Sequence, residues 1–137
     1  MPLANAVLNP FLEKSLPKVI DARVHGIIDY CHASFFFGMA ILCRRRNPRA
    51  ATAALLAGSF VLVESLLTDY PLGIAKVIPF ETHGRLDSAF AASSSLVPKL
   101  FGFNETGAAA IFEGNALVEA TVVGMTDFSN ESAQADR

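Results

Sequence analysis

Two long stretches of this chain carry almost no polar side chain, and they constrain the fold more than any other feature. Residues 35–42 are apolar throughout, and residues 51–63 contain only Thr52 and Ser59 as polar residues. A helix on the surface of a soluble bundle needs a polar outer face, whereas a helix that is apolar all round is buried in protein or lies in lipid. The sequence therefore favours helices that lie in a membrane.

Four apolar segments follow one another, at residues 24–43, 50–67, 86–101 and 108–125. Each is close in length to the ~20 residues that a helix needs to cross the hydrocarbon core of a bilayer. Only 18% of the residues are charged, whereas ordinary soluble domains carry about 25%. The sequence thus predicts an all-α fold: a single membrane domain over residues 1–137, built as a bundle of four transmembrane helices.

The charged residues predict the environment of the chain and its orientation in the membrane. The net charge is −2, which provides no basic footprint for nucleic acid, so membrane lipid is the expected environment. Four arginines lie in the connector at residues 44–49. Because short cytoplasmic loops are enriched in Arg and Lys, this connector is predicted to face the cytoplasm.

An internal repeat with an offset of 58 residues adds a second constraint. Three motifs recur at this offset without a gap: Lys-Val-Ile (18–20 and 76–78), His-Gly-x-x-Asp (25–29 and 83–87) and Thr-Asp-aromatic (68–70 and 126–128). Such self-similarity is the sequence signature of a duplicated structural unit. We predict two tandem helical hairpins, with repeat one at about 18–70, repeat two at about 76–128 and a flexible tail at 129–137.

The repeat also predicts where the polar motifs lie. The His-Gly-x-x-Asp motif opens the first helix of each hairpin and the Thr-Asp motif closes the second. Two hairpins that enter the membrane from the same side bring all these motifs to one end of the bundle. The sequence therefore predicts a layer of six polar side chains: His25, Asp29, Asp69, His83, Asp87 and Asp127.

Three interpretations of this layer stay open at this point. Imidazole and carboxylate groups are ordinary ligands for zinc, manganese or iron, so the layer could be an ion site. The simpler interpretation is a structural polar cap in which each side chain is hydrogen-bonded, because buried polar groups usually are. It could also be a docking surface for a quinone, a haem or a partner subunit. The spacing of these six residues does not identify a particular metal or cofactor.

Four further ionisable residues inside the apolar segments are secondary candidates: His32, Glu64, Glu113 and Glu119. His32 follows His25 by seven residues, so it lies on the same helix face and could extend a proton path. Glu113 and Glu119 are six apart and do not share a helix face. Hydrogen bonding to a Ser or Asn of a neighbouring helix is the simpler expectation for the acids.

Three runs of residues resemble a known group of proteins: HGIIDY at 25–30, SLLTDYPLG at 65–73 and LVPKLFGF at 96–103. They resemble small bacterial membrane proteins of the SPW-repeat type, in which each repeat has two transmembrane helices. The signature Ser-Pro-Trp of that group reads Val97-Pro98-Lys99 here, without the Trp. The resemblance implies two-helix membrane repeats and a location in a bacterial inner membrane, and it implies no activity.

The sequence contains no nucleophile–base pair, phosphate loop or nucleotide motif, so it favours binding or assembly over catalysis. The first hypothesis is an accessory or scaffold subunit, or an assembly factor, of a membrane complex that binds partner subunits or forms a homo-oligomer. The alternative is an ion-, metal- or cofactor-binding membrane protein that uses the predicted His/Asp layer.

Overall fold

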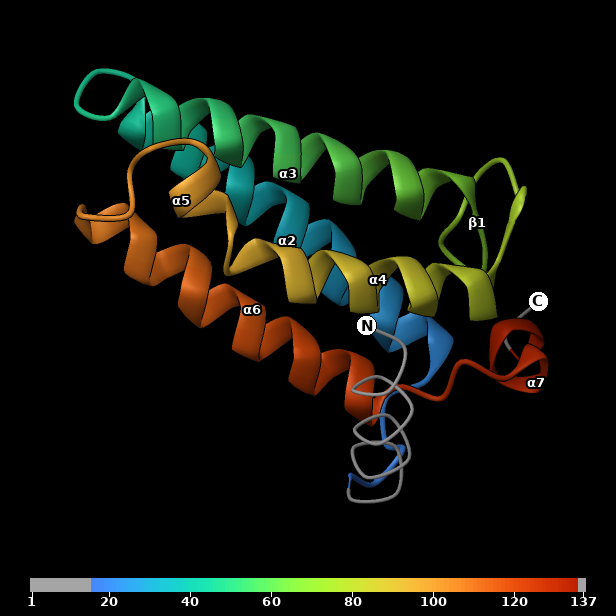
Figure 1. Cartoon of the computed structure of the whole chain (residues 1–137). Coiled ribbons are helices and arrows are strands. Elements are labelled where there is room, and N and C mark those ends of the chain that lie inside the picture. Colours follow the sequence, from blue (N-terminus) through green and yellow to red (C-terminus); the bar gives the residue numbers. More distant parts are fainter. Residues whose placement is uncertain (1–15, 136–137) are drawn as a thin grey trace.

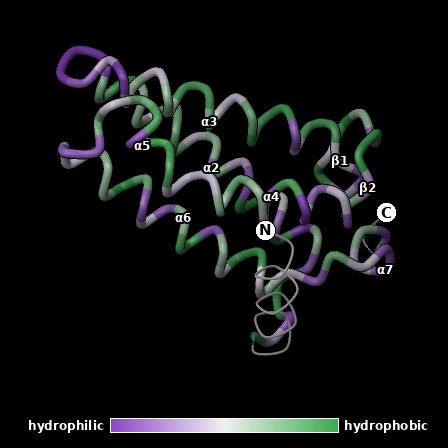
Figure 2. The backbone as a smooth tube through the Cα atoms, viewed as in Figure 1, coloured by the Kyte–Doolittle hydropathy of each residue, from purple (hydrophilic) through white to green (hydrophobic). Residues whose placement is uncertain are grey.

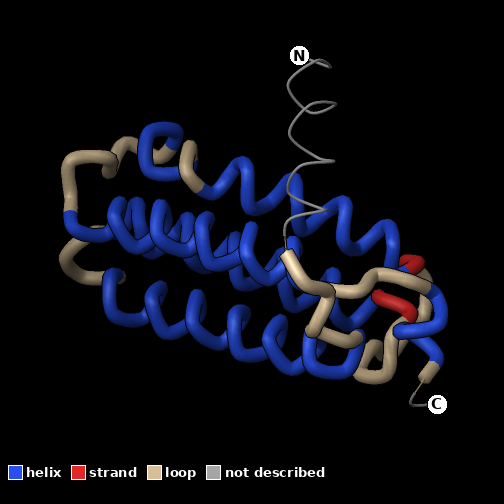
Figure 3. Tube along the Cα trace, turned by 90° about the horizontal axis from the view of Figure 1, so that it is seen from below, coloured by secondary structure: helices blue, strands red, loops and turns tan. Residues whose placement is uncertain are grey.

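Four helices lying side by side dominate the structure, a computed structural model that describes residues 16–135. They are α2 (Ala22–Cys43), α3 (Pro48–Leu67), α4 (Phe80–Ser94) and α6 (Gly107–Met125). Helix α2 packs along α3, and α4 packs along α6. Figure 1 shows the two pairs next to each other, and the view in Figure 3 agrees. The described part of the chain is mostly helical, as the sequence predicts, with two short strands in addition.

Short elements close the two ends of these helices. Strands β1 (Thr68–Asp69) and β2 (Ile78–Pro79) pair in parallel, with Thr68 opposite Ile78. A separate parallel bridge joins Ile20 to Thr126. Helix α7 (Asn130–Gln134) lies at the same end as the strands, whereas α5 (Val97–Leu100) lies at the opposite end (Figure 1).

Local sequence signals set the helix boundaries. The side chain of Asp21 accepts a hydrogen bond from the backbone N–H of Val24 at 2.8 Å and caps α2. Asn47 caps α3 in the same way, and Pro48 follows it at the first helical position, where a missing N–H costs nothing.

The segment predicted at 86–101 differs from the structure. Helix α4 begins earlier, at Phe80, and ends at Ser94, and the short α5 follows it. Pro98 cannot donate a hydrogen bond to the carbonyl of Ser94, so a continuous helix breaks before it.

Small residues allow the helices to approach one another closely. The core between α2 and α3 is rich in alanine, with Ala50, Ala53 and Ala54 buried around Phe36. A Cβ atom added at Gly58 would lie 3.1 Å from the Cβ atom of Phe36. Such small-residue contacts are the usual way in which helices pack within a membrane.

Three of the helices, α2, α3 and α6, are long and apolar enough to cross a membrane. Their outward faces carry large apolar side chains, and Leu42 and Leu117 are more than 70% exposed. Figure 2 shows hydrophobic colouring along most of their length. The predicted apolar helices at 24–43, 50–67 and 108–125 are therefore confirmed. Helix α4 is not among the three.

The predicted flexible tail at 129–137 is wrong for part of its length. Residues Asn130–Gln134 form α7, in which Ala133 is buried against Ala22 and Phe80. The hydroxyl of Ser132 accepts a hydrogen bond from the backbone N–H of Ala22. A polar composition concealed this docking, because only one apolar side chain is needed to anchor so short a helix. Residues 136–137 lie outside the described part of the chain.

Candidate metal centre

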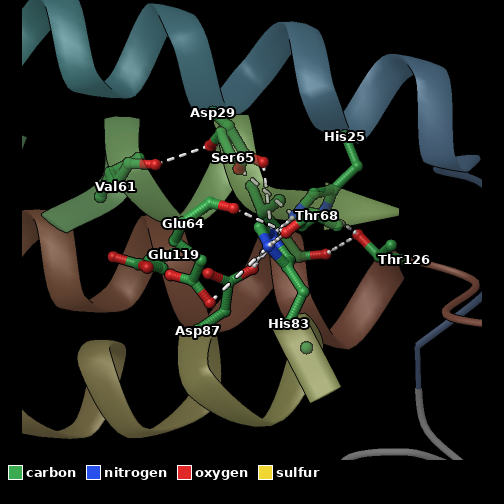
Figure 4. Close-up of polar contacts among 12 residues, drawn as sticks. His25, Asp29, Val61, Glu64, Ser65, Thr68, His83, Asp87, Glu119 and Thr126 are labelled. Atoms are coloured by element: carbon green, nitrogen blue, oxygen red, sulfur yellow. Dashed lines mark hydrogen bonds and ion pairs between the residues drawn. The ribbon is translucent and has the colours of Figure 1, made fainter. Parts of the chain in front are cut away.

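Two histidines and two aspartates meet between α2 and α4, near the end that carries the strands. His25 and Asp29 belong to α2, and His83 and Asp87 belong to α4 (Figure 4). Residues four apart on a helix share a face, so each helix presents one imidazole and one carboxylate to the other. All four side chains are buried, and the two histidines are only 1% exposed.

The contacts between these four side chains cross from one helix to the other. The Nε2 atoms of the two histidines are 3.1 Å apart. His25 Nε2 lies 3.0 Å from Asp87 Oδ2, and His83 Nε2 lies 3.3 Å from Asp29 Oδ2. Within each helix the corresponding distances are 3.3 Å and 3.1 Å. One nitrogen or oxygen atom from each of the four residues can be chosen so that all lie within 4.8 Å of one another.

Two threonine hydroxyls hold the other nitrogen of each imidazole. Thr126 Oγ1 lies 2.9 Å from His25 Nδ1, and Thr68 Oγ1 lies 2.8 Å from His83 Nδ1. Each hydroxyl proton is already committed, because Thr126 donates to the carbonyl of Val122 and Thr68 donates to the carbonyl of Glu64, both at 2.7 Å. A hydroxyl has a single proton, so each threonine must accept from the histidine.

This arrangement fixes the tautomer of both rings. With Nδ1 carrying the proton, the Nε2 atom of a neutral imidazole keeps its lone pair, and both Nε2 atoms face the centre of the cluster. Metal-binding histidines are held in the same way, because the ring nitrogen that does not bind the metal donates to an oxygen atom that orients the ring. His25 and His83 are thus oriented as ligands.

The backbone bridges explain why the threonines are in place. Thr68 pairs with Ile78 just before α4 begins, and Thr126 pairs with Ile20 just before α2 begins. Each bridge fastens the end of one helix to the start of another. The hydroxyl is thereby held beside a histidine in the first turn of the neighbouring helix.

The predicted layer of six residues is reduced to four in the structure, because Asp69 and Asp127 are not part of the group formed by His25, Asp29, His83 and Asp87. Successive residues in extended backbone point in opposite directions. Thr126 is fully buried and faces His25, so Asp127 turns away. Asp127 is exposed, and its side chain accepts a hydrogen bond from the backbone N–H of Ser129.

Tyr70 and Glu64 complete the surroundings of the cluster. The Tyr70 hydroxyl donates to Asp29 Oδ2 at 3.0 Å. Burial raises the pKa of Tyr70, so the hydroxyl keeps its proton and remains a donor. Glu64 is buried with its Oε1 atom 3.6 Å from His83 Nδ1. This oxygen has no hydrogen-bond partner among the described residues.

Two glycines bring the aromatic residues against the cluster. A Cβ atom at Gly26 would lie 2.9 Å from Tyr70 Cε2, and one at Gly84 would lie 2.8 Å from Phe128 Cδ1. Contacts this short leave no room for a larger residue. The glycine after each histidine therefore lets a ring cover the polar cluster.

The secondary candidates fall into separate places. His32 lies near Glu119, with its Nε2 atom 2.7 Å from the Oδ1 atom of Asn115. Glu119 is buried and accepts from Asn115 Nδ2 at 3.4 Å. Glu113 is exposed on the outer face of α6. Of the four secondary candidates, Glu64 is the one that approaches a cluster histidine through a side-chain contact.

Sequence reasoning missed four residues around the cluster: Thr68, Tyr70, Asn115 and Thr126. A signal existed for the threonines, because Thr68 and Thr126 recur at the same 58-residue offset as the histidines. The prediction placed the neighbouring aspartates in the layer instead, although the threonines recur at the same offset. No comparable signal marks Asn115, which has Ala57 at the corresponding position.

Comparisons with protein-family models, with curated proteins and with solved structures found no match to this chain. The geometry of the cluster and the helices that hold it are therefore the observations that bear on function.

Proposed function

We propose that this chain is an integral membrane protein that binds one divalent transition-metal ion, with Zn²⁺ as the reference ion. Its ligands are the two imidazole Nε2 atoms of His25 and His83 and the carboxylates of Asp29 and Asp87. The observation that carries the proposal is the convergence of two threonine-oriented lone pairs with two buried carboxylates.

The spacing of these atoms suits a metal ion. In a tetrahedral site with metal–ligand bonds of about 2.0–2.1 Å, neighbouring ligand atoms lie about 3.3 Å apart. The distances between imidazole Nε2 and carboxylate oxygen range from 3.0 to 3.3 Å, and the two Nε2 atoms are 3.1 Å apart. All four atoms of the set lie within 4.8 Å of one another, so side-chain adjustment would be needed to bring every pair to the tetrahedral spacing.

The charge of the cluster also calls for a cation. Both Nδ1 positions are protonated, so neutral imidazoles leave two buried carboxylates without a compensating charge. Removing an unpaired charge from water costs several kcal/mol. One proton on either Nε2 atom could be donated to the other ring or to a carboxylate, but it would compensate only one of the two carboxylates. One divalent ion neutralises both carboxylates and uses both lone pairs.

The ligand types narrow the choice of metal. Imidazole nitrogen with carboxylate oxygen suits zinc, iron, manganese, cobalt and copper, whereas calcium and magnesium prefer oxygen ligands alone. Zinc favours four ligands in a tetrahedron, and this cluster offers four. The free cysteines Cys31 and Cys43 lie outside the cluster, so a thiolate site is not part of the proposal.

The proposal includes the predicted architecture: four membrane helices formed by two parallel hairpins. Contacts related by the 58-residue offset support it. The His25–Thr126 contact corresponds to His83–Thr68, and the bridge Ile20–Thr126 corresponds to Ile78–Thr68. An approximate twofold axis along the membrane normal would pass between the two histidines. In this account α4 completes the set of spanning helices together with α5.

We expect the protein to stay in membranes after an alkaline carbonate wash and to carry one Zn²⁺ per chain. The measurement is elemental analysis of protein extracted in mild detergent, purified with a tag that contains no histidine. Chelator-treated protein should regain one ion when Zn²⁺ is added. The double variant His25→Ala/His83→Ala is expected to regain none.

The matched control is His32→Ala, which removes an imidazole from the same helix but outside the cluster. This variant should still bind one ion per chain. Equal metal content in the double variant and the parent protein would show that the metal sits elsewhere. Absence of metal from the parent protein, before and after loading, would overturn the proposal.

A further inference from the structure

A pocket of about 390 Å³ opens beside the cluster, between α2 and α6. Its base contains His25, Asp29 and Asp87, and its walls are mostly apolar. Ile111 and Val118 line it and are also exposed on the outer surface of α6. In a membrane that surface faces lipid, so the pocket would connect the hydrocarbon core with the proposed metal. Its volume lies within the range of about 300–1,000 Å³ that small-molecule sites occupy.

At the place related by the 58-residue offset, between α3 and α4, two aromatic rings stand where the pocket has His32 and Val118. Phe90 stands 58 positions after His32, and Phe60 stands 58 positions before Val118. Their rings stack between α3 and α4, with centroids 5.2 Å apart and an interplanar angle of 12°. The pocket is therefore a specific departure from the internal symmetry and is not imposed by helix packing.

Apart from the cluster residues at its base, the polar residues that line this pocket stand where the two halves differ. Asn115 and Glu119 have Ala57 and Val61 at the corresponding positions, and His32 has Phe90. All three polar residues line the pocket. Figure 4 shows Glu119 beside Asp87, next to the cluster. Polar groups at membrane depth are costly and commonly mark a binding site.

The hydrogen bonds among these three residues leave acceptor atoms unused. Asn115 Nδ2 donates to Glu119 Oε2, which directs the Oδ1 atom of the amide toward His32. His32 Nε2 must then donate to Oδ1, so the Nδ1 atom of the ring keeps a lone pair. Among the described residues, neither His32 Nδ1 nor Glu119 Oε1 makes a hydrogen bond. A ligand that offers a proton suits both atoms.

We propose that this pocket binds a lipid-soluble molecule with a hydroxyl head group, such as an alkylated phenol. The hydroxyl donates its single proton to one of the two free acceptors, Glu119 Oε1 or His32 Nδ1, and the alkyl part of the molecule lies between Ile111 and Val118 toward the lipid. A carboxylate head is disfavoured by the nearby acids, and a ketone or ether lacks the proton. The proposal rests on the proposed function, because the hydroxyl oxygen would lie next to the metal ion.

The test uses a 4-alkylphenol with a photoreactive diazirine in its alkyl chain, added to the protein in lipid nanodiscs. Crosslinks mapped by mass spectrometry are expected within residues 28–35 and 111–123. Unlabelled 4-octylphenol should reduce the labelling at least about tenfold, whereas its methyl ether, which lacks the hydroxyl proton, should not. Labelling spread over all helices, or equal competition by the ether, would overturn the proposal.

A double variant fills the pocket with phenylalanine, the residue that stands at both corresponding positions, Phe90 and Phe60. His32→Phe/Val118→Phe should lose the labelling and still bind one metal ion per chain. Leu117→Phe places the same ring on the outer face of α6, beside the pocket lining, and should be labelled like the parent. Unchanged labelling of the filled variant would contradict the proposal.

An experiment with Co²⁺ in place of Zn²⁺ distinguishes failure of the pocket proposal from failure of the proposed metal binding. Co²⁺ bound by the cluster should give visible absorption bands, and 4-octylphenol should shift them. Bands without any effect of the phenol would remove the pocket proposal alone. Competed crosslinking in protein that binds no metal would support the pocket and remove the metal.

Discussion

Replacement of His83 with alanine is expected to lower the affinity for Zn²⁺ by about 10²–10³-fold. Structural zinc sites with four ligands bind the ion with a free energy of about 10–16 kcal/mol, which is about 3 kcal/mol for each ligand. A loss of about 1.4 kcal/mol lowers the affinity tenfold. His25→Ala should have an effect of the same size, because the two rings occupy equivalent places around the centre. Competition with a chromophoric chelator measures both affinities in detergent.

His32→Ala serves as the control for these two variants. Its ring lies on α2 like that of His25, but its nitrogen contacts Asn115 in the pocket. The affinity of this variant for Zn²⁺ should stay within about threefold of the parent, which is less than 1 kcal/mol. Loss of affinity in His32→Ala equal to that in His83→Ala would place the metal outside the cluster.

Replacement of Thr68 with valine is expected to weaken Zn²⁺ binding by about 10–100-fold, although the threonine touches no metal. Valine has nearly the same shape but cannot accept the Nδ1–H of His83. The ring then has no partner that fixes its tautomer, and a buried N–H group loses its hydrogen bond at a cost of about 1–3 kcal/mol. Thr126→Val should act equally through His25. The chelator competition described for the histidines measures both.

Two controls distinguish this orienting role from a general effect of the hydroxyl. Thr68→Ser keeps a hydroxyl and should retain most of the affinity. Thr52 also donates its hydroxyl to the carbonyl four residues earlier on α3, but it contacts no histidine, so Thr52→Val should bind Zn²⁺ normally. If Thr68→Val binds as tightly as Thr52→Val, the threonine does not set the tautomer.

The sequence predicted which helices meet at the cluster better than it predicted the atoms that face one another. The 58-residue offset brought His25 and His83 together in the prediction, although nothing in their local sequence links them. Contacts between equivalent residues are what the proposed duplication of a hairpin predicts. In the structure these two rings, with Asp29 and Asp87, are in contact.

The remaining features depended on long-range pairing that periodicity does not report. The bridge between Ile20 and Thr126 joins the two ends of the described chain, and a two-residue strand has no hydrophobic pattern of its own. Without it, the side of the backbone on which Thr126 lies cannot be deduced, and the neighbouring Asp127 was predicted to lie in the polar layer instead. The docking of α7 through Ala133 was missed for the same reason.

The preferred function also changed because of details at atomic scale. Apolar helices alone favoured a scaffold subunit over an ion-binding protein. The proposal of an ion-binding protein depends instead on the two threonine hydroxyls, because their bonds to backbone carbonyls turn both imidazole lone pairs toward the two carboxylates. A motif such as His-x-x-x-Asp cannot convey which ring nitrogen faces the centre. That choice is made by Thr68 and Thr126, which are far from the histidines in the sequence.

X-ray absorption spectroscopy of the zinc-loaded protein in detergent tests the central claim most directly. The account predicts four nitrogen or oxygen atoms at about 2.0–2.1 Å from the metal, two of them from imidazole rings that give multiple-scattering features. A sulfur atom at about 2.3 Å would assign the metal to Cys31 or Cys43. A spectrum with that sulfur, or with fewer than two imidazoles, would contradict the assignment of His25 and His83 as metal ligands.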